Sequence, residues 1–229
     1  MKRFLERKAI YISFTTCHKY MNTELNLYSI TRRKRKNNVS GKNHKVFDNL
    51  LNRDFSAEAP NLKWCIDFTY LFLQNGNKRY NCTIIDLFDR SVIASVTGKE
   101  MTAELARETL SKGVKDNPQA VRTKLILHSD QGSQFTSNEF TEVCKKYGIQ
   151  QSMSRAGCPY DNAPMERYFN TLKIERIYNY TYSSDEQLNE AIINFAYVWY
   201  NHARPHSYNC GLTPAQKRKN FGLKCYNFA

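Results

Sequence analysis

Hydrophobic residues recur in a β-strand pattern from Leu62 onward. Three segments rich in β-branched and aromatic residues follow one another, and each predicts a strand: residues 62–73, 79–88 and 91–97. The turn sequence Asn75-Gly76-Asn77 separates the first two segments, and Asp89-Arg90 separates the second from the third. Because both connections are short, we expect the three strands to form an antiparallel meander.

After the third strand the apolar spacing alternates between helix and strand periods. Apolar residues three and four apart predict helices over residues 102–114, 138–147, 163–177 and 184–202. Short apolar runs predict two further strands, over residues 123–128 and 149–153. Thr102 and either Ser183 or Ser184 are predicted N-caps, and Gly148 is a predicted C-cap. This order of elements predicts an α/β fold, a mixed five-stranded sheet with helices on both faces.

The first 55 residues differ from the rest of the chain in charge. The 229 residues include 34 Lys and Arg against 21 Asp and Glu, and residues 1–55 hold 13 of the basic residues but only four of the acidic ones. A protein this basic usually binds a polyanion, most often nucleic acid. We therefore divide the chain into a basic N-terminal extension and linker, residues 1–55, and a folded core, residues 56–229.

The sharpest basic cluster lies in the linker and comprises Arg32, Arg33, Lys34, Arg35 and Lys36. Asn, Ser and Gly follow it through Asn43, which indicates an extended segment rather than a packed element. We expect the cluster to contact DNA phosphates. A solvated linker without specific contacts is the alternative. Residues 15–27, before the cluster, are compatible with a short helix.

Composition argues against several other classes of protein. No apolar run reaches the ~18 residues that a membrane-spanning helix needs, so we expect no membrane partner. The seven cysteines are scattered and include no Cys-x-x-Cys pair, which argues against a disulfide framework or a zinc ribbon. His202, His206 and Cys210 have a spacing that superficially suggests zinc. Arg204-Pro205 interrupts any helix there, however, and no second cysteine lies close.

Three acidic residues occupy positions that favour a catalytic role. Asp67 lies in the middle of the first strand among apolar neighbours, where an ionised carboxylate is costly unless it is paired or bound to a metal. Asp130 follows the strand over 123–128, and Gly132 permits a sharp turn at this carboxyl end, where open α/β sheets bind ligands. Glu166 lies in the first turn of a predicted helix, directly after a polar loop.

Carboxylates from three separate elements could form a cage of oxygen ligands for two Mg²⁺ ions, one to activate an attacking oxygen and one to stabilise the leaving oxygen. Each acid also has an ordinary structural interpretation. Asp67 could pair with a basic residue, Asp130 could cap a turn, and Glu166 could favour the positive end of its helix. From the residues alone, these alternatives stay open.

The local sequences around the three acids carry a resemblance. WCIDFTYL, HSDQGSQF and GCPYDNAPMERYFNTLKIE resemble the three signature blocks of the integrase-core transposases of bacterial insertion sequences, the OrfB type with a DDE triad, in the retroviral integrase superfamily. YNHARPHSYNCGLTPAQ is similar to the C-terminal block of that family. The resemblance covers roughly residues 16–218. It implies an RNase H-like fold and assigns residues 56–229 as the integrase catalytic core.

The resemblance also implies an activity, which is metal-dependent DNA strand cleavage and strand transfer. Asp67, Asp130 and Glu166 match the triad and are expected to be both catalytic residues and ligands of two Mg²⁺ or Mn²⁺ ions. Helical spacing places Asn170 and Lys173 on the face of Glu166, and related retroviral integrases use this face to contact the viral DNA end. We therefore predict that both residues bind DNA, although Lys173 could equally be a solvated helix residue.

Other polar residues near the motifs have more than one interpretation. Arg155 and Arg167 flank the loop before the third acid and are further candidates for phosphate contacts. His128 is expected to pack near the site. Arg204 is expected to brace the fold or contact phosphate, and Asp89-Arg90 suggests a turn with an ion pair.

The family implies partners and a location. We expect DNA, both element ends and target, as the substrate, a homo-oligomer on that DNA, and a separate small helix-turn-helix protein. A bacterial cytoplasmic, nucleoid-associated location follows. Because residues 1–15 show no clear two-helix pattern, we interpret residues 1–55 as the remnant of a longer DNA-binding region. An RNase H-like nuclease without strand transfer, and a decayed nucleic-acid-binding protein, are the alternative functions.

Overall fold

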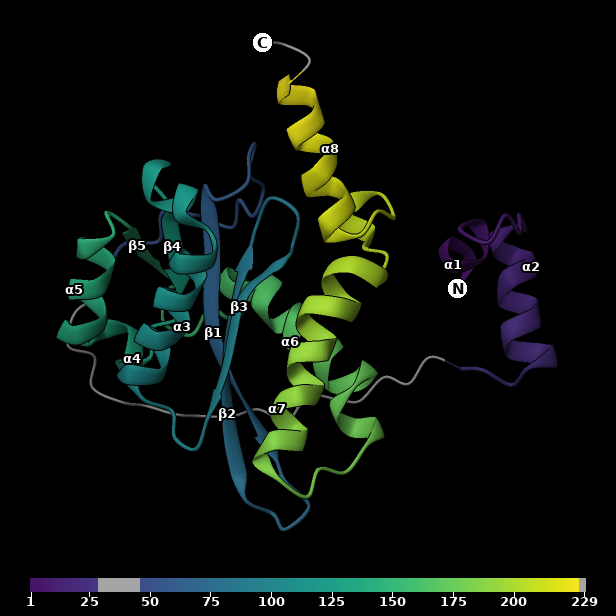
Figure 1. Ribbon diagram of the computed structural model, residues 1–229, viewed down its shortest axis with the longest axis horizontal. Helices are drawn as coiled ribbons and strands as arrows, with labels where there is room; N and C mark the ends of the chain where they lie inside the picture. Colours follow the sequence, from purple (N-terminus) through teal and green to yellow (C-terminus); the bar gives the residue numbers. More distant parts are fainter. Residues whose placement is uncertain (29–45, 227–229) are drawn as a thin grey trace.

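A mixed five-stranded sheet forms the centre of the protein (Figure 1). The computed structural model describes residues 1–28 and 46–226. The strands are β1 (Lys63–Phe72), β2 (Lys78–Asp86), β3 (Val92–Gly98), β4 (Ile126–Ser129) and β5 (Gln150–Met153). Their order across the sheet is β3-β2-β1-β4-β5; β1, β2 and β3 are antiparallel, whereas β4 and β5 run parallel to β1. The predicted meander and the predicted mixed sheet are both confirmed.

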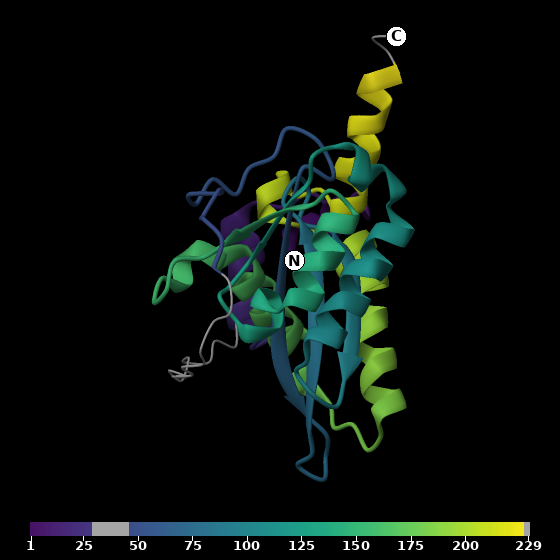
Figure 2. The same ribbon diagram turned by 90° about the vertical axis from the view of Figure 1, so that its left-hand side faces the viewer.

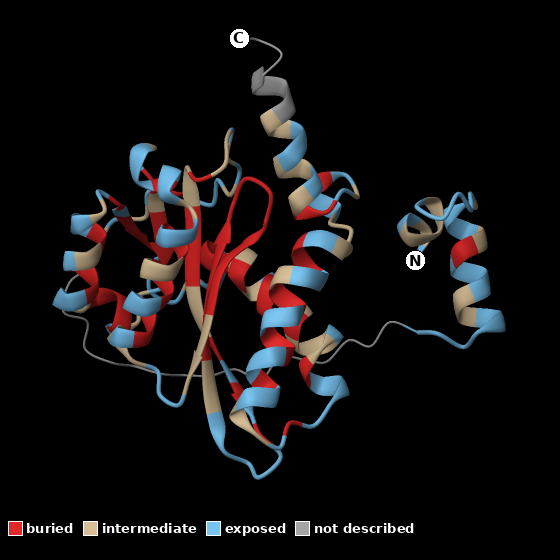
Figure 3. Cartoon of the chain, in the orientation of Figure 1, coloured by how far each residue is buried: buried red, intermediate tan, exposed pale blue. Residues whose placement is uncertain are grey.

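Helices cover both faces of the sheet, as predicted. The main ones are α3 (Ala103–Asp116), α4 (Ser133–Thr136), α5 (Asn138–Lys146), α6 (Ala163–Glu175), α7 (Asp185–Ile193), the π-helical segment η5 (Asn194–Ala203) and α8 (Pro214–Tyr226). Short 3₁₀ turns are η2 (Pro118–Arg122), η3 (Pro159–Asn162), η4 (Ile177–Asn179) and η6 (Ser207–Asn209). One hydrophobic core lies between the sheet and α3 with α5, and the other between the sheet and α6, α7 and η5. Figure 3 shows the buried residues along the sheet and on the sides of the helices that face it.

The alternation of β1 side chains connects these two cores. Trp64 and Ile66 belong to the core under α3 and α5, whereas Cys65 and Leu71 belong to the core under α6 and η5. Because successive side chains of a strand point to opposite faces, Asp67 lies on the face of Cys65 and α6. The strand that buries apolar residues on both faces therefore also directs one carboxylate toward α6.

The predicted helix boundaries carry the capping chemistry that the sequence indicates. The Thr102 side chain accepts a hydrogen bond from the Leu105 N–H, and Ser184 accepts one from the Gln187 N–H. Gly148, just beyond α5, has φ of +66°, a backbone conformation that glycine adopts without a steric penalty.

Two features at the C-terminal side differ from the sequence prediction. The long helix predicted over 184–202 is present, but its second half is π-helical. The helix α8, which projects from one end of the sheet (Figure 2), was not predicted. Its sequence has no strong apolar stripe, and polar contacts hold it in place: Lys217 Nζ donates to the Phe88 carbonyl and Arg218 binds two buried carboxylates.

The N-terminal segment contains two short helices, α1 (Lys2–Glu6) and α2 (Phe14–Lys19), and α2 continues into the π-helical turn η1 (Tyr20–Glu24). α2 and η1 correspond to the helix predicted over residues 15–27, although α2 begins one residue earlier, whereas α1 was not predicted. The Phe4 ring stacks on Trp199 with centroids 5.8 Å apart, and Arg7 Nη1 donates to the Ala203 carbonyl at 2.6 Å. The segment therefore contacts η5. Within the described residues, no helix is long and apolar enough to cross a membrane.

A buried ion cluster joins α8 to the end of β2. Arg218 Nη2 donates to Asp86 Oδ2 at 2.6 Å and its Nε donates to Asp89 Oδ2 at 2.6 Å, and both carboxylates are fully buried. The predicted turn at 89–90 is present, but the predicted ion pair within it is wrong. Arg90 donates to the Phe55 carbonyl and lies over the Tyr208 ring instead. Burial raises the pKa of Asp86 to about 6 even though Arg218 opposes that effect.

We expect Arg218→Ala to lower the free energy of unfolding by about 2–4 kcal/mol. Removing one partner of a fully buried pair costs about 3–5 kcal/mol because the other charge is left uncompensated, and Arg218 is itself partly exposed. Urea unfolding of the purified chain measures the change. Arg107→Ala is the matched control, because Arg107 pairs with Glu104 on the surface and its loss should leave stability nearly unchanged. Equal losses in the two variants would contradict the importance of the buried cluster.

Candidate active site

Parallel strand pairing places Asp67 beside Asp130. β1 and β4 pair in register from Lys63 with Ile126 to Cys65 with His128. Side chains at one register position of parallel strands point to the same face, so two residues further on Asp67 lies next to Asp130, directly beyond the end of β4. The two predicted acids thus lie on the face of the sheet that α6 covers.

Both of the other predicted acids affect the electrostatic environment of Asp67. Burial raises the pKa of the Asp67 carboxyl well above its usual value, the charge of Asp130 adds to this effect, and Glu166 contributes further. The backbone N–H of Phe68 donates to Asp67 Oδ1 at 2.7 Å, and Asn162 Nδ2 donates to Oδ2 at 3.0 Å. These two donors fix the orientation of the carboxylate.

Asp130 begins the turn that leaves β4. The Gly132 N–H donates to Asp130 Oδ1 at 2.9 Å, and burial raises the pKa of Asp130 above its usual value. A side chain at Gly132 would place its Cβ 2.9 Å from Asp130 Oδ1 and 2.9 Å from Gln134 Oε1. A larger residue here would therefore require the Asp130 or Gln134 side chain to move, whereas the backbone φ of −58° is ordinary. Asp130 both caps this turn and faces Asp67.

Two contacts hold α6, the helix that carries Glu166, in place. The ring of Tyr168 packs edge-on against Tyr200 of η5, with centroids 5.0 Å apart. At the other end of α6, the Arg204 guanidinium forms a fork with the Glu175 carboxylate, with Nη2 to Oε1 at 2.7 Å. Arg204 therefore braces the helix, one of the two roles expected from the sequence.

Lys173 lies next to the triad, two turns along α6 from Glu166. Burial lowers its pKa, and the nearby Asp67 charge partly offsets this effect. Its Nζ lies 4.7 Å from the centre of the Tyr70 ring. It is therefore not a solvated helix residue. Asn170, on the same helix, is exposed.

For the other predicted DNA-binding residues, the structure gives contacts with groups other than the three acids. Arg155 is exposed over part of its side chain, and its Nε donates to Asp161 Oδ2 at 3.1 Å. Arg167 is exposed and lies near enough to His206 to help lower the pKa of that histidine. The basic cluster lies outside the described residues; it comprises Arg32, Arg33, Lys34, Arg35 and Lys36.

A hydrogen-bonded cluster behind the triad was not predicted from the sequence. The buried Asp161 carboxylate accepts from Arg53 Nε at 2.6 Å, from Asn49 Nδ2 at 2.9 Å and from Arg155. The Arg53 guanidinium, followed by that of Arg155, holds the pKa of Asp161 well below its usual range. In the sequence, an Asp-Asn pair before a helix looks like ordinary capping residues, so no signal distinguished it.

His128 connects this cluster to the neighbouring strands. Its ring is fully buried, with Nδ1 2.8 Å from Ser152 Oγ and Nε2 2.9 Å from the Asp161 carbonyl. Because a carbonyl can only accept, Nε2 carries the proton and Nδ1 accepts from the serine. Burial lowers the pKa of His128 to about 4, so the ring is neutral. The expectation that His128 packs near the site is confirmed.

The donor set consists of carboxylates, which are the ligands that a hard divalent cation prefers. Among the described residues, no three His, Cys, Asp or Glu side chains are grouped closely enough to hold a metal ion as they stand, and this includes the spacing of His202, His206 and Cys210. Burial raises the pKa of both Asp67 and Asp130, and the charge of Asp130 adds to the rise at Asp67. Carboxylate oxygens with such mutual repulsion are the ligands that a divalent cation stabilises.

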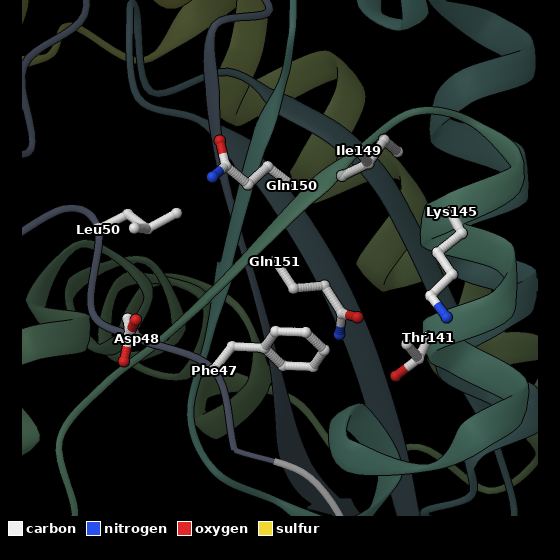
Figure 4. A pocket seen from close by; sticks show the side chains of 8 residues that line it. All are labelled: Phe47, Asp48, Leu50, Thr141, Lys145, Ile149, Gln150 and Gln151. Carbon is white, nitrogen blue, oxygen red and sulfur yellow. The ribbon is translucent and has the colours of Figure 1, made fainter.

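A cavity of about 300 Å³ lies away from the triad (Figure 4). The segment before β1 forms one side of it, and α5 with β5 forms the other. Its lining residues are Phe47, Asp48, Leu50, Thr141, Lys145, Ile149, Gln150 and Gln151. Because none of the three acids lines this cavity, it is separate from the candidate active site.

Comparisons with known proteins identify the family. Two family models, both described as integrase core domain, match residues 57–159 and 147–214. Transposase InsF for insertion sequence IS3A of Escherichia coli (strain K12) is 38% identical over 173 residues, which are 75% of this chain and 58% of the relative. The insertion element IS600 uncharacterized 31 kDa protein of Shigella sonnei is 34% identical over 202 residues, 88% of this chain and 73% of the relative. The chain thus spans 58% of the length of InsF.

Solved structures confirm the RNase H-like fold of integrase and transposase catalytic cores. A chain of the simian T-cell lymphotropic virus intasome in complex with PP2A regulatory subunit B56 gamma has a TM-score of 0.59 at 20% identity, covering 95% of this chain and 73% of that one. The HTLV-2 integrase catalytic core domain in complex with magnesium has a TM-score of 0.52 at 22% identity, covering 71% and 99%. The Mos1 transposase catalytic domain with raltegravir and Mg has a TM-score of 0.52 at 14% identity, covering 60% and 72%.

The two domain matches together span most of the folded core. The alignment with the IS600 protein is longer and covers 88% of the chain. The three acids lie within the matched residues: Asp67 and Asp130 fall in the first match, and Glu166 falls in the second. The chain therefore belongs to the insertion-sequence transposases that carry an integrase core domain.

Proposed function

We propose that this chain catalyses metal-dependent DNA strand cleavage and strand transfer, with Asp67, Asp130 and Glu166 as the ligands of two Mg²⁺ or Mn²⁺ ions. The observation that carries the proposal is the in-register pairing of β1 with β4, which places the buried Asp67 beside Asp130 on the face that α6 covers. Burial, Asp130 and Glu166 accordingly raise the pKa of Asp67. Such crowding of carboxylates is unfavourable in a protein without a cation and favourable around one. The relatives named as transposases, and the related cores solved with magnesium, support the same assignment.

The reaction has two steps that use the same groups. Water attacks a phosphodiester, a new P–O bond forms, and the bond to the 3′ oxygen breaks, so that this oxygen leaves as a 3′ hydroxyl. That hydroxyl then attacks a phosphodiester of the target, loses its proton, and displaces the target's 3′ oxygen, which takes up a proton. Two cations, held by Asp67, Asp130 and Glu166, would supply activation of the attacking oxygen and stabilisation of the leaving one.

The side chains of the protein orient the reaction. Asp67 is held by the Phe68 N–H and by Asn162, and Asp130 by the Gly132 N–H, so their oxygens are placed before substrate binds. Lys173 provides a positive charge beside the acids, where we place a phosphate of the DNA end. Asn170, Arg155 and Arg167 extend this surface.

DNA as the partner is supported by the excess of 34 basic over 21 acidic residues. A homo-oligomer on DNA is supported by the likeness to a chain of a viral intasome. Three expectations stay predictions: the separate helix-turn-helix protein, the nucleoid-associated location in the bacterial cytoplasm, and the origin of residues 1–55 as the remnant of a DNA-binding region.

We expect Asp67→Asn, Asp130→Asn and Glu166→Gln each to reduce Mg²⁺-dependent DNA nicking about 10³-fold or more while sparing DNA binding. Loss of a metal ligand removes several kcal/mol of transition-state stabilisation. Nicking of supercoiled plasmid measures the activity, and fluorescence anisotropy with a DNA duplex measures binding. Glu104→Gln, on the far face of the sheet, is the control and should retain activity.

Near-normal nicking by one of these variants would remove that residue from the catalytic set. Products that join donor to target DNA distinguish a transposase from a plain RNase H-like nuclease. A wild-type chain that binds DNA but neither binds Mn²⁺ nor nicks DNA would instead be a decayed nucleic-acid-binding protein.

We expect Lys173→Met to weaken DNA binding and to lower the salt dependence of the binding constant by about one unit of slope. One phosphate contact releases about one counterion from the duplex. Anisotropy titrations at a series of salt concentrations give this slope. Lys115→Met is the control, because Lys115 is an exposed lysine at the end of α3, on the opposite face of the sheet. An unchanged slope in Lys173→Met would show that Lys173 contacts no phosphate.

A further inference from the structure

We propose that Asn162 is a positioning residue of the active site: its side-chain amide sets the orientation of the Asp67 carboxylate, and the Asp161 cluster holds Asn162 in place for this purpose. The inference rests on the proposed function, because it assigns a role within the same metal-dependent reaction. The residues concerned, Asp161 and Asn162, are adjacent in the sequence, and neither belongs to the triad.

The contact between Asn162 and Asp67 joins distant parts of the chain. Asn162 Nδ2 donates to Asp67 Oδ2 at 3.0 Å, across 95 residues of sequence. The other carboxylate oxygen accepts from the Phe68 N–H, a donor on the same strand. A carboxylate with one donor on each oxygen has a fixed plane, and its remaining lone pairs then point in fixed directions. Partners that orient a ligand in this way commonly matter nearly as much as the ligands.

Asn162 does not perform the task that its position in the helix predicts. It is the N-cap residue of α6, where an asparagine side chain usually accepts a hydrogen bond from a backbone N–H of the first turn. The structure shows no such capping bond from Asn162. The side chain therefore gives up a stabilising local contact, and its amide is used across the site instead.

The other atom of this amide is also informative. Asn162 is 5% exposed, and its Oδ1 is buried without a hydrogen-bond partner among the described residues. A buried and unpaired carbonyl is unfavourable. Because Oδ1 and Nδ2 belong to one planar amide, this unpaired acceptor lies next to the nitrogen that holds Asp67. The side chain is thus placed for the contact with Asp67 at a cost to its own hydrogen bonding.

The residue before Asn162 is anchored from three directions. The Asp161 carboxylate accepts from Asn49 and Arg53 of the segment before β1, and from Arg155 after β5. Its carbonyl accepts from the neutral ring of His128 in β4. Because His128 lies two residues before Asp130, this cluster connects the strand that leads to Asp130 with Asn162.

The first test measures the contact in the metal-free chain. We would record the side-chain amide ¹H–¹⁵N signals of Asn162 and Asn209, assigned by their disappearance in Asn162→Ala and Asn209→Ala. Asn209 is a matched residue: it is 3% exposed, its Nδ2 donates to the Asp89 carbonyl at 2.7 Å, and its Oδ1 is also unpaired. Asp67→Ala should shift the Asn162 signals and leave those of Asn209 in place.

The second test measures the consequence for the site. We expect Asn162→Ala to raise the Kd for Mn²⁺, measured by calorimetry without DNA, roughly 10- to 100-fold. The kcat of nicking should fall by a similar factor while the KM for DNA stays unchanged. Asn209→Ala should lower the thermal midpoint but keep the Mn²⁺ affinity and the nicking rate of the wild type.

The outcomes separate this inference from the proposed function. The positioning role would be overturned if Asp67→Ala left the Asn162 amide signals unshifted. It would also be overturned if Asn162→Ala kept the wild-type Mn²⁺ affinity. Equal losses of stability and Mn²⁺ affinity in the two alanine variants would overturn it too, since these would indicate a structural role alone. A wild-type chain that neither binds Mn²⁺ nor nicks DNA contradicts the proposed function, and the amide signals still decide whether Asn162 holds Asp67.

Discussion

The in-register pairing of β1 with β4 is the constraint on which the site depends. It places two carboxylates side by side at the point where β4 ends. Burial raises the pKa of both acids, and the charge of Asp130 raises that of Asp67 further. The sheet tolerates this because hydrophobic cores on both faces stabilise β1. The unfavourable electrostatics at one point of a stable sheet is the physical basis for assigning a cation site there.

The third acid depends on contacts far from it in the sequence. The C-terminal block, which resembles a family signature, works as a brace: Tyr200 packs against Tyr168, Asn201 binds both the N–H and the carbonyl of Val92 at the edge of β3, and Arg204 holds Glu175. These contacts fix α6 against the sheet, and α6 carries Glu166. The conformation of the site therefore comes from the whole core rather than from the three motifs alone.

Much of this arrangement could be predicted because it rests on local signals. A run of β-branched and aromatic residues revealed β1, and Thr102 and Gly148 marked helix ends. An acid among apolar neighbours revealed Asp67. Features held by polar contacts between distant residues were missed: α8 is anchored by Arg218 on buried carboxylates, and Asn162 looks like an ordinary cap until its contact with Asp67 is seen. The periodicity of apolar residues and the spacing of motifs do not indicate which distant polar side chains will pair.

Diffraction from crystals grown with Mn²⁺, recorded for its anomalous signal, tests the central claim most directly. The account predicts two peaks about 3.5–4 Å apart, with oxygens of Asp67, Asp130 and Glu166 drawn in as their ligands. Peaks bound only by other residues, or an absence of anomalous density between these three side chains at saturating Mn²⁺, would contradict it.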